Sequence, residues 1–299
     1  MTKKLIWTLL ICIFLFVVGV YVFSHLRRTP PPNTNPASNW PALPPGNPAN
    51  PPASSGRNPK APPASPSEAK NESLPVEPRF VLRPGETLEY DANVTKLNST
   101  VANLKIVAAE KRNNGGKGSW HLQAFAHTEN PYRMVFELDD QFDSYSDAGS
   151  MTSLQYEMHL NERGQKVDSV ERLLSSPNDP PPAGTSAARV LPGTRDPLGM
   201  LEYLRSVDWN HITEVHSPVY DGHKLYNVRA VLVGKSAGVS VPAGKYNTIK
   251  VEIHVMDNGA EMKDAHFVLY LTDDAARLPV LMEAVLPVAT ARVELTKTK

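Results

Sequence analysis

Apolar and polar residues alternate strictly in many segments of the last two thirds of this chain. The first such segment runs from Leu88 to Val94, where every second residue is apolar and the residues between them are polar. Because successive side chains of a β-strand point to opposite faces of a sheet, this pattern predicts a strand with one buried face. The pattern recurs in eight further segments, which are residues 104–108, 120–126, 154–160, 226–232, 249–255, 267–271, 278–284 and 289–295.

The predicted strands favour one large antiparallel sheet. Strands of parallel sheets are covered on both faces and read as continuous apolar runs, whereas one-sided alternation is typical of antiparallel sheets. Turn-forming residues separate the segments where hairpins are needed. These turns are residues 113–116, 161–164, 221–222, 242–244 and 257–259. We therefore expect a mainly β domain, built as a single large curved antiparallel sheet or a partly open barrel.

One α-helix is predicted to cover the sheet. Asp196 is a good N-cap, and Pro197 suits the first helical position. The apolar side chains that share one helical face are Leu198, Leu201 and Leu204. We expect a helix over residues 196–205, preceded by an exposed Pro/Ala/Gly-rich loop insertion over residues 175–194.

The N-terminal segment predicts a membrane anchor. Residues 5–23 are 19 residues without a charged side chain, and at ~1.5 Å per residue they would cross the ~30 Å hydrocarbon core as a helix. A cleaved signal peptide is the alternative, but its apolar run is usually only about 7–15 residues long. A lipoprotein signal at Cys12 is disfavoured because the bulky Ile11 precedes it. Since large domains are translocated largely regardless of charge, we expect residues 1–29 to form a single-pass anchor in a bacterial inner membrane, with the C-terminal domain in the periplasm.

A proline-rich segment separates this anchor from the predicted strands. Sixteen of the 28 prolines lie between Pro30 and Pro78. Such a composition cannot bury a core, so residues 30–78 are expected to form a disordered tether. This leaves residues 79–299 as the segment able to build a folded domain.

Charge and cysteine content exclude several classes of function. The formal net charge is zero, and no dense run of Lys and Arg follows residue 79 that could neutralise nucleic-acid phosphates. The single cysteine, Cys12, lies in the apolar N-terminal run. The folded part therefore has no internal disulfide, no cysteine nucleophile and no cysteine-ligated zinc site. We expect no nucleic-acid partner and no cofactor.

Patterns that resemble catalytic signatures lack the context that they need. Residues 234–238 match the G-x-S-x-G pattern of hydrolases, but the residues after them predict a strand and a turn instead of a helix. The adjacent carboxylates Asp139–Asp140 and Asp273–Asp274 are expected to serve in turns and caps, because neighbours in a strand point to opposite faces. Arg277 is expected to pair with one carboxylate of the second pair and to fix the following turn.

Several histidines and one aspartate lie close together in the sequence. His211, His216 and His223, together with Asp221, have spacings that a metal could use, because imidazole is a common ligand for zinc and copper. Their spacing matches no compact metal-binding motif. We expect them to be polar surface residues, and we predict no metal site and no catalytic residue.

Five stretches occur in a recognisable order over residues 80–297. They are Pro84–Asp91, Asp196–Arg205, Asp221–Gly222 with Leu225–Tyr226, Val241–Ile249 and Leu271–Val280. Together they resemble the bacterial family DUF3108, a domain of unknown function. The resemblance implies an exported protein with a signal or anchor segment, and it carries over no catalytic residues. The long tether and the insertion at residues 175–194 depart from the family pattern.

These features are compatible with three kinds of function. By analogy with curved β shells that carry lipids or lipoproteins, the leading hypothesis is an apolar ligand bound in a cavity between the helix and the sheet. Its predicted lining residues are Leu201, Tyr203, Tyr226 and Phe267. The alternative is a structural or protein-interaction module of the cell envelope. An enzyme is less favoured, because it would need polar candidates to converge in one cleft. Those candidates are Asp221, His223, Asp273 and Arg277.

Overall fold

The computed structural model describes residues 82–299 except residues 96, 98, 115–116, 177, 181–182, 263–265 and 287–288. The predicted membrane anchor (residues 1–29) and the predicted tether (residues 30–78) lie outside the described residues. Within the described part, no helix combines the length and the apolar character needed to cross a membrane.

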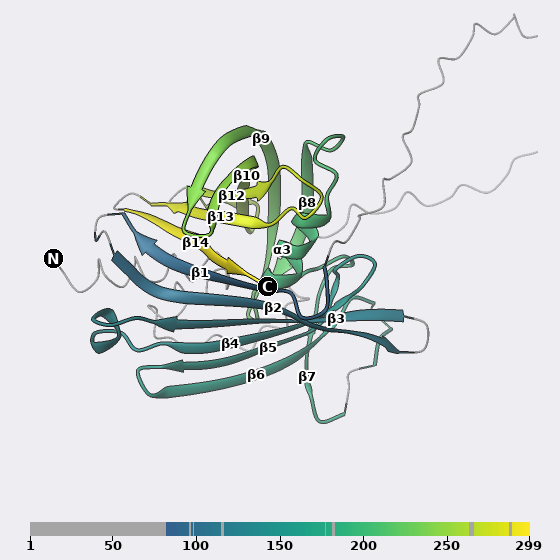
Figure 1. Cartoon of the computed structure of the whole chain (residues 1–299). Coiled ribbons are helices and arrows are strands. Elements are labelled where there is room, and N and C mark those ends of the chain that lie inside the picture. Colours follow the sequence, from purple (N-terminus) through teal and green to yellow (C-terminus); the bar gives the residue numbers. More distant parts are fainter. Residues whose placement is uncertain are drawn as a thin grey trace, which may run out of the picture.

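The described residues form one 14-stranded sheet with one α-helix and one short 3₁₀-helix (Figure 1). The strands are β1 (Thr87–Val94), β2 (Ser99–Asn114), β3 (Lys117–Thr128), β4 (Asp139–Asp147), β5 (Ser153–Glu162), β6 (Gln165–Leu174), β7 (Ser186–Arg189), β8 (Glu214–Tyr220), β9 (Leu225–Val241), β10 (Gly244–Asp257), β11 (Ala260–Glu261), β12 (His266–Thr272), β13 (Pro279–Val285) and β14 (Thr290–Thr298). The helices are η2 (Tyr132–Met134) and α3 (Pro197–Ser206). Each segment predicted from alternation overlaps one of these strands.

The strands follow one continuous order across the sheet. That order is β7-β6-β5-β4-β3-β2-β1-β14-β13-β12-β10-β9-β8, with β11 paired to β10 at the side. All of these neighbours are antiparallel except β6 and β7, which are parallel. The predicted single large antiparallel sheet is therefore confirmed. It is not closed into a barrel, because the end strands β7 and β8 do not pair with each other.

The first and last strands lie side by side in the middle of the sheet. β1 has β2 on one side and β14 on the other. The N–H of Thr87 donates to the carbonyl of Lys299 at 3.1 Å, and the N–H of Lys299 donates to the carbonyl of Thr87 at 3.0 Å. The chain therefore enters β1 next to its own C-terminus.

Several contacts link the two ends of the curved sheet, and one of them is made by the backbone of Arg195. Arg195, which precedes α3, forms a parallel bridge with Val219 of β8. Its backbone N–H donates to the carbonyl of Pro218 at 3.0 Å, and its carbonyl accepts the N–H of Tyr220 at 2.8 Å. The segment after β7 thus reaches across to β8 at the opposite edge of the sheet.

The helix α3 covers the inner face of the sheet. It contacts β3 and β4 in one half of the sheet and β8 in the other, and Figure 1 shows it where the two halves face each other. The apolar residues predicted to share one helical face, Leu198, Leu201 and Leu204, are buried in one cluster with the inward side chains of the sheet. The predicted covering helix is confirmed.

The helix begins where the sequence indicates. The Asp196 side chain accepts the backbone N–H of Gly199 at 2.9 Å, and Pro197 is the first helical residue. A side chain at Gly199 would lie 3.0 Å from the carbonyl of Met151, so glycine lets the first turn approach the loop between β4 and β5 closely. The N-cap and the close approach together fix this end of α3 against the sheet.

The prediction that Asp139 and Asp140 serve in a turn or cap was wrong. Both belong to β4, and Asp140 is buried. Alternation was hidden in this strand because two of its inward positions, Ser144 and Ser146, are also polar. Ser144 donates to Asp196 at 2.5 Å and contacts Ser146 at 2.9 Å, so the N-cap of α3 accounts for polar residues at inward positions.

The prediction of an exposed loop over residues 175–194 was wrong in part. Residues 186–189 form β7, which pairs in parallel with β6. Ala188 and Val190 are buried in a small cluster with Leu173 and Tyr220. The Pro/Ala/Gly-rich composition concealed this strand because β7 is only four residues long.

Candidate functional site

The residues predicted to line an apolar cavity lie in the packed interior. Leu201, Tyr226 and Phe267 are buried, and Leu201 and Phe267 belong to the main core cluster. The half-buried ring of Tyr203 packs against this cluster and lies 3.6 Å from the guanidinium carbon of Arg195. Burial raises the pKa of Tyr226 well above its ordinary value. Leu201 and Phe267 therefore belong to the hydrophobic core, and the Tyr203 ring lies against the guanidinium group of Arg195.

The predicted polar candidates occupy two different turns. Asp221 lies in the β8–β9 turn, where it accepts the N–H of His223 at 2.8 Å and that of Lys224 at 2.9 Å. Burial raises the pKa of Asp221 to about 6. Asp273 and Arg277 lie in the β12–β13 turn and pair at 3.3 Å, as predicted. The local hydrogen bonds of both groups indicate turn stabilisation.

Several stretches that carry the family resemblance meet beneath α3. Arg205 of the helix pairs with Glu202 at 2.8 Å and with Glu86 at 2.7 Å, and it donates to the carbonyl of Ala276 at 3.3 Å. These partners come from the helix, from the segment before β1 and from the β12–β13 turn. The contacts of Arg205 therefore hold together elements that are distant in the sequence.

A row of polar side chains crosses the outer face of β3, β4, β5 and β6, on the side opposite α3. Their neighbours in sequence point inward, so these side chains point outward. The strand register places them beside one another. We call this row the polar ladder, and it consists of His121, Gln123, Gln141, Asp143, Gln155, Glu157, His159 and Asp168.

Asp143 is the most buried member of the polar ladder, at 4 % exposed. Its Oδ1 accepts from Nε2 of His121 at 2.7 Å and from the amide of Gln123 at 2.8 Å, and its Oδ2 accepts from the amide of Gln141 at 2.7 Å. The His121 ring stacks on Tyr145 with ring centres 4.4 Å apart. These contacts hold the carboxylate in one orientation.

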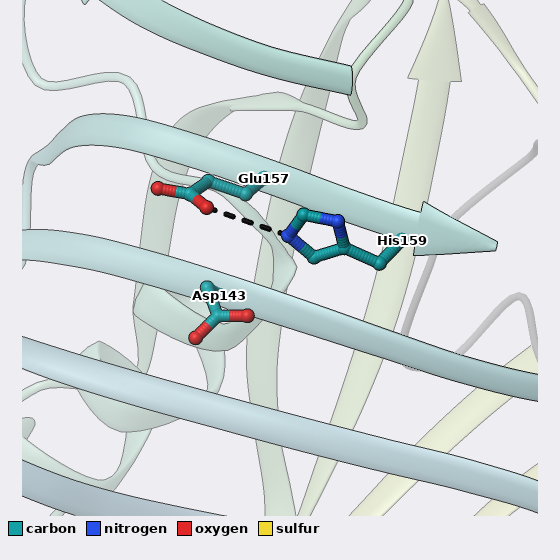
Figure 2. Close-up of side chains that lie close together, drawn as sticks. All are labelled: Asp143, Glu157 and His159. Atoms are coloured by element: carbon teal, nitrogen blue, oxygen red, sulfur yellow. Dashed lines mark ion pairs between the residues drawn. The ribbon is translucent and has the colours of Figure 1, made fainter. Parts of the chain in front are cut away.

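Glu157 and His159 complete a cluster with Asp143. Figure 2 shows the Glu157 carboxylate and the His159 ring on one strand, with Asp143 on its neighbour. His159 Nε2 lies 3.4 Å from Glu157 Oε2, and His159 Nδ1 lies 2.8 Å from Oδ1 of Asp168. The hydrogen bond to Asp168 raises the pKa of His159. Asp143, Glu157 and His159 each offer one ligand atom, and these atoms lie within 4.8 Å of one another.

Sequence reasoning missed this cluster. Glu157 and His159 were recognised only as outward polar positions of a strand, and Asp143 belongs to β4, which was not predicted. The usable signal was an acid and a histidine two residues apart in an alternating segment. The position of Asp143 opposite Glu157 depends on the register of β4 and β5, which the sequence does not reveal.

A groove of about 670 Å³ continues this outer face over β1, β2, β3 and β4, and Thr296 of β14 also lines it. Two aromatic residues line it, the buried Tyr90 and the half-buried Phe125, and the ammonium group of Lys105 lies 6.0 Å from the ring centre of Phe125. Asp139 forms an ion pair with Arg133 at 2.5 Å, and this pairing lowers the pKa of Asp139. The groove is lined by Glu89, Tyr90, Asp91, Asn103, Leu104, Lys105, Phe125, Ala126, His127, Asp139, Asp140, Gln141 and Thr296.

Comparisons with known proteins identify a family. The model of a family described as protein of unknown function (DUF3108) matches residues 89–296. The comparison with curated proteins found no match.

Among solved structures, a β-barrel-like protein of the domain of unknown function DUF1849 from Brucella abortus aligns with a TM-score of 0.46 and 14 % identity, over 72 % of this chain and 97 % of that chain. A candidate lipoprotein from Parabacteroides distasonis aligns with a TM-score of 0.37 and 10 % identity, over 76 % of this chain and 100 % of that chain. A candidate exported protein with a YmcC-like fold from Bacteroides fragilis aligns with a TM-score of 0.35 and 10 % identity, over 75 % of this chain and 100 % of that chain. These scores are too low to transfer a function.

Proposed function

This chain belongs to the DUF3108 family of proteins of unknown function, and we propose that its folded domain is a non-enzymatic protein-interaction module of the bacterial cell envelope. The observation that carries this proposal is the groove on the outer face of β1 to β4. Its volume is about 670 Å³, within the range of about 300–1,000 Å³ that is common for binding pockets. Its walls combine an aromatic ring with charges of both signs, which suits recognition of a polar protein surface.

The sheet edges are less suited to binding a partner strand. β7 has only four residues, and β8 contains Pro218, which lacks a backbone N–H. Arg195 also pairs with part of β8 at its free edge. Short edges and edge prolines are devices that prevent pairing with a strand of another chain. The broad outer face therefore supports partner binding best.

Carriage of an apolar ligand between α3 and the sheet is the second candidate. In its favour, the buried hydroxyls of Tyr90 and Tyr156 have no hydrogen-bond partner among the described residues, and a ligand could supply one. Against it, Leu201 and Phe267, which were predicted to line the cavity, pack within the core cluster. This packing favours the interaction module.

An extracytoplasmic position is part of the proposal. The predicted single-pass anchor in residues 1–29 would hold the domain at the inner membrane, on the periplasmic side. In polyproline II geometry, at ~3.1 Å per residue, the predicted tether would reach on the order of 150 Å. Such reach suits a module that meets partners away from the membrane surface.

The proposal is tested by placing a photo-crosslinking amino acid at Phe125 in the full chain, expressed in cells. Phe125 lies in the groove, and the matched control position is Val233, an exposed apolar residue on β9 outside the groove. We expect a discrete protein adduct from position 125 and none from position 233.

Equal adducts at both positions, or none at position 125, would contradict the groove as a partner surface. Native mass spectrometry with lipid extraction on the purified full chain distinguishes the interaction module from the second candidate, carriage of an apolar ligand. A stoichiometric lipid released from protein that gives no adduct would establish ligand carriage in place of the interaction module.

A further inference from the structure

Three side chains of metal-ligand type converge in the polar ladder. Ligand atoms of Asp143, Glu157 and His159 lie within 4.8 Å of one another (Figure 2). Asp143 on β4 is directly opposite Glu157 on β5, and His159 is two residues further along the same face. The backbone of two paired strands therefore fixes the relative positions of the three groups. We propose that they form a binding site for a divalent transition-metal ion, with zinc as the best fit.

His159 is oriented as a metal-ligating histidine would be. Its Nδ1 lies 2.8 Å from a carboxylate oxygen of Asp168, directly opposite on β6. A histidine that binds a metal through one ring nitrogen commonly donates its other N–H to a carboxylate, which fixes the ring. With that proton on Nδ1, the lone pair of Nε2 faces Oε2 of Glu157 at 3.4 Å. This arrangement leaves a nitrogen lone pair and a carboxylate oxygen facing one point, which favours a cation between them.

The separation of Nε2 and Oε2 fits two ligands of one tetrahedral ion. With metal–ligand bonds of about 2.0–2.2 Å, two ligands on a tetrahedral edge lie about 3.4 Å apart. Asp143 offers its ligand atom within 4.8 Å of the other two, and to reach the same ion its carboxylate must release one of its present hydrogen bonds. The His159 side chain is 37 % exposed, so solvent reaches the site and water can fill a fourth position.

The local charges also favour a bound cation. Asp143 and Glu157 are directly opposite each other on adjacent strands, where like charges destabilise a sheet. In the described part of the chain, the ion pairs of these two carboxylates are to His121 and His159 and not to lysine or arginine. One imidazole nitrogen with two carboxylate oxygens suits zinc better than Mg²⁺ or Ca²⁺, which prefer sites made of oxygen alone.

The test is zinc titration of the full chain, purified in detergent without a histidine tag and stripped with EDTA, followed by calorimetry. We expect one equivalent of Zn²⁺ to bind. His159→Gln and Glu157→Gln should each weaken binding at least about tenfold, and Asp168→Asn should weaken it by about 10- to 100-fold, through loss of the partner that orients His159.

The matched control is His127→Gln. His127 also pairs with a carboxylate, Glu129, at 3.0 Å, but it lies outside the converging set, so zinc affinity should not change. Zinc uptake that survives the combined His159→Gln and Glu157→Gln changes would place the ion elsewhere and overturn the site. Absence of saturable uptake by the wild-type chain would also overturn the site.

A measurement on the unaltered chain keeps the proposal testable if a variant misfolds. Co²⁺ bound in the site should give the intense visible absorption of four-coordinate cobalt with nitrogen and oxygen ligands, and Zn²⁺ should displace it. A spectrum equal to that of hydrated Co²⁺ would refute the site. Melting temperatures of all variants in EDTA, compared with the wild-type value, separate loss of ligands from loss of fold.

Discussion

Asp140 is a carboxylate on the inner side of the sheet. It is 3 % exposed, its Oδ1 accepts the backbone N–H of Asn161 at 2.8 Å, and its Oδ2 has no hydrogen-bond partner among the described residues. Burial raises the pKa of Asp140 to about 7, and the negative charges of Glu162 and Asp139 contribute to this rise. An unfolded chain releases the same proton near pH ~4. At this residue the folded domain therefore binds a proton that the unfolded chain has lost.

The pH dependence that follows has a definite sign. Because the folded-state pKa of Asp140 is raised, its neutral form stabilises the fold fully below pH ~4, and this contribution is lost as the pH rises toward about 7. Asp140→Asn keeps an oxygen for the Asn161 N–H and removes the ionisation. We expect it to raise the free energy of unfolding at pH 8 by on the order of 1–3 kcal/mol, with no such gain at pH 4. Urea denaturation followed by tryptophan fluorescence measures both values.

The neighbouring carboxylate supplies the control. Asp139 points to the opposite face, pairs with Arg133, and has a lowered pKa. Asp139→Asn should therefore give no gain at pH 8. An equal gain from both substitutions would show that net charge, and not burial of Asp140, sets the pH dependence.

At the scale of the element, the start of α3 depends on one buried carboxylate. Asp196 accepts the backbone N–H of Gly199 at 2.9 Å and the hydroxyls of Ser144 and Ser153 at 2.5 Å each. Burial raises the pKa of Asp196, and these hydrogen bonds oppose the rise. The same carboxylate thus caps the helix and binds it to β4 and β5.

Loss of this carboxylate should lower the free energy of unfolding by more than the loss of an ordinary N-cap does. Asp196→Ala removes the cap and leaves buried donors without an acceptor, so we expect a loss of about 2–5 kcal/mol in the free energy of unfolding. Asp196→Asn retains an oxygen for Gly199 and should lose less. Chemical denaturation of both variants measures the difference, and equal losses would contradict a capping role.

At the scale of the whole molecule, Arg205 joins distant parts of the chain. Its pairs with Glu202 and Glu86 and its hydrogen bond to Ala276 connect α3, the segment before β1 and the β12–β13 turn. Arg205→Met would leave a buried, uncompensated negative charge at Glu202, and we expect a loss of about 3–5 kcal/mol in the free energy of unfolding.

A second change at Glu202 tests the cause of that loss. Arg205→Met combined with Glu202→Leu removes the stranded charge and should recover most of the stability, since apolar replacement of a buried pair is often nearly neutral. Denaturation curves of the single and double variants measure the coupling. A double variant no more stable than Arg205→Met would point to lost packing instead of charge.

The sequence predicts the strands that follow a simple rule and conceals those that do not. Alternation identified β1 and eight further strands, and the Asp196–Pro197 pair located α3, whereas β8 was not predicted although Val215 and Val219 are buried. β4 was hidden because its inward positions include Asp140, Ser144 and Ser146, which are polar, and Ser144 donates to the N-cap Asp196. The cluster of Asp143, Glu157 and His159 could not be predicted, because it depends on which residues face each other across strands, and this register is a property of the folded sheet.

The place where the chain enters β1 determines how the domain responds to mechanical load. A pull on the N-terminal segment reaches β1 first, and β1 is hydrogen-bonded to β2 on one side and to β14 on the other. Extraction of β1 would have to break both ladders together, in shear, whereas an edge strand such as β7 or β8 could be peeled away one bond at a time. Entry through the central strand would therefore let the domain bear tension between the proposed anchor and a proposed partner without losing its sheet.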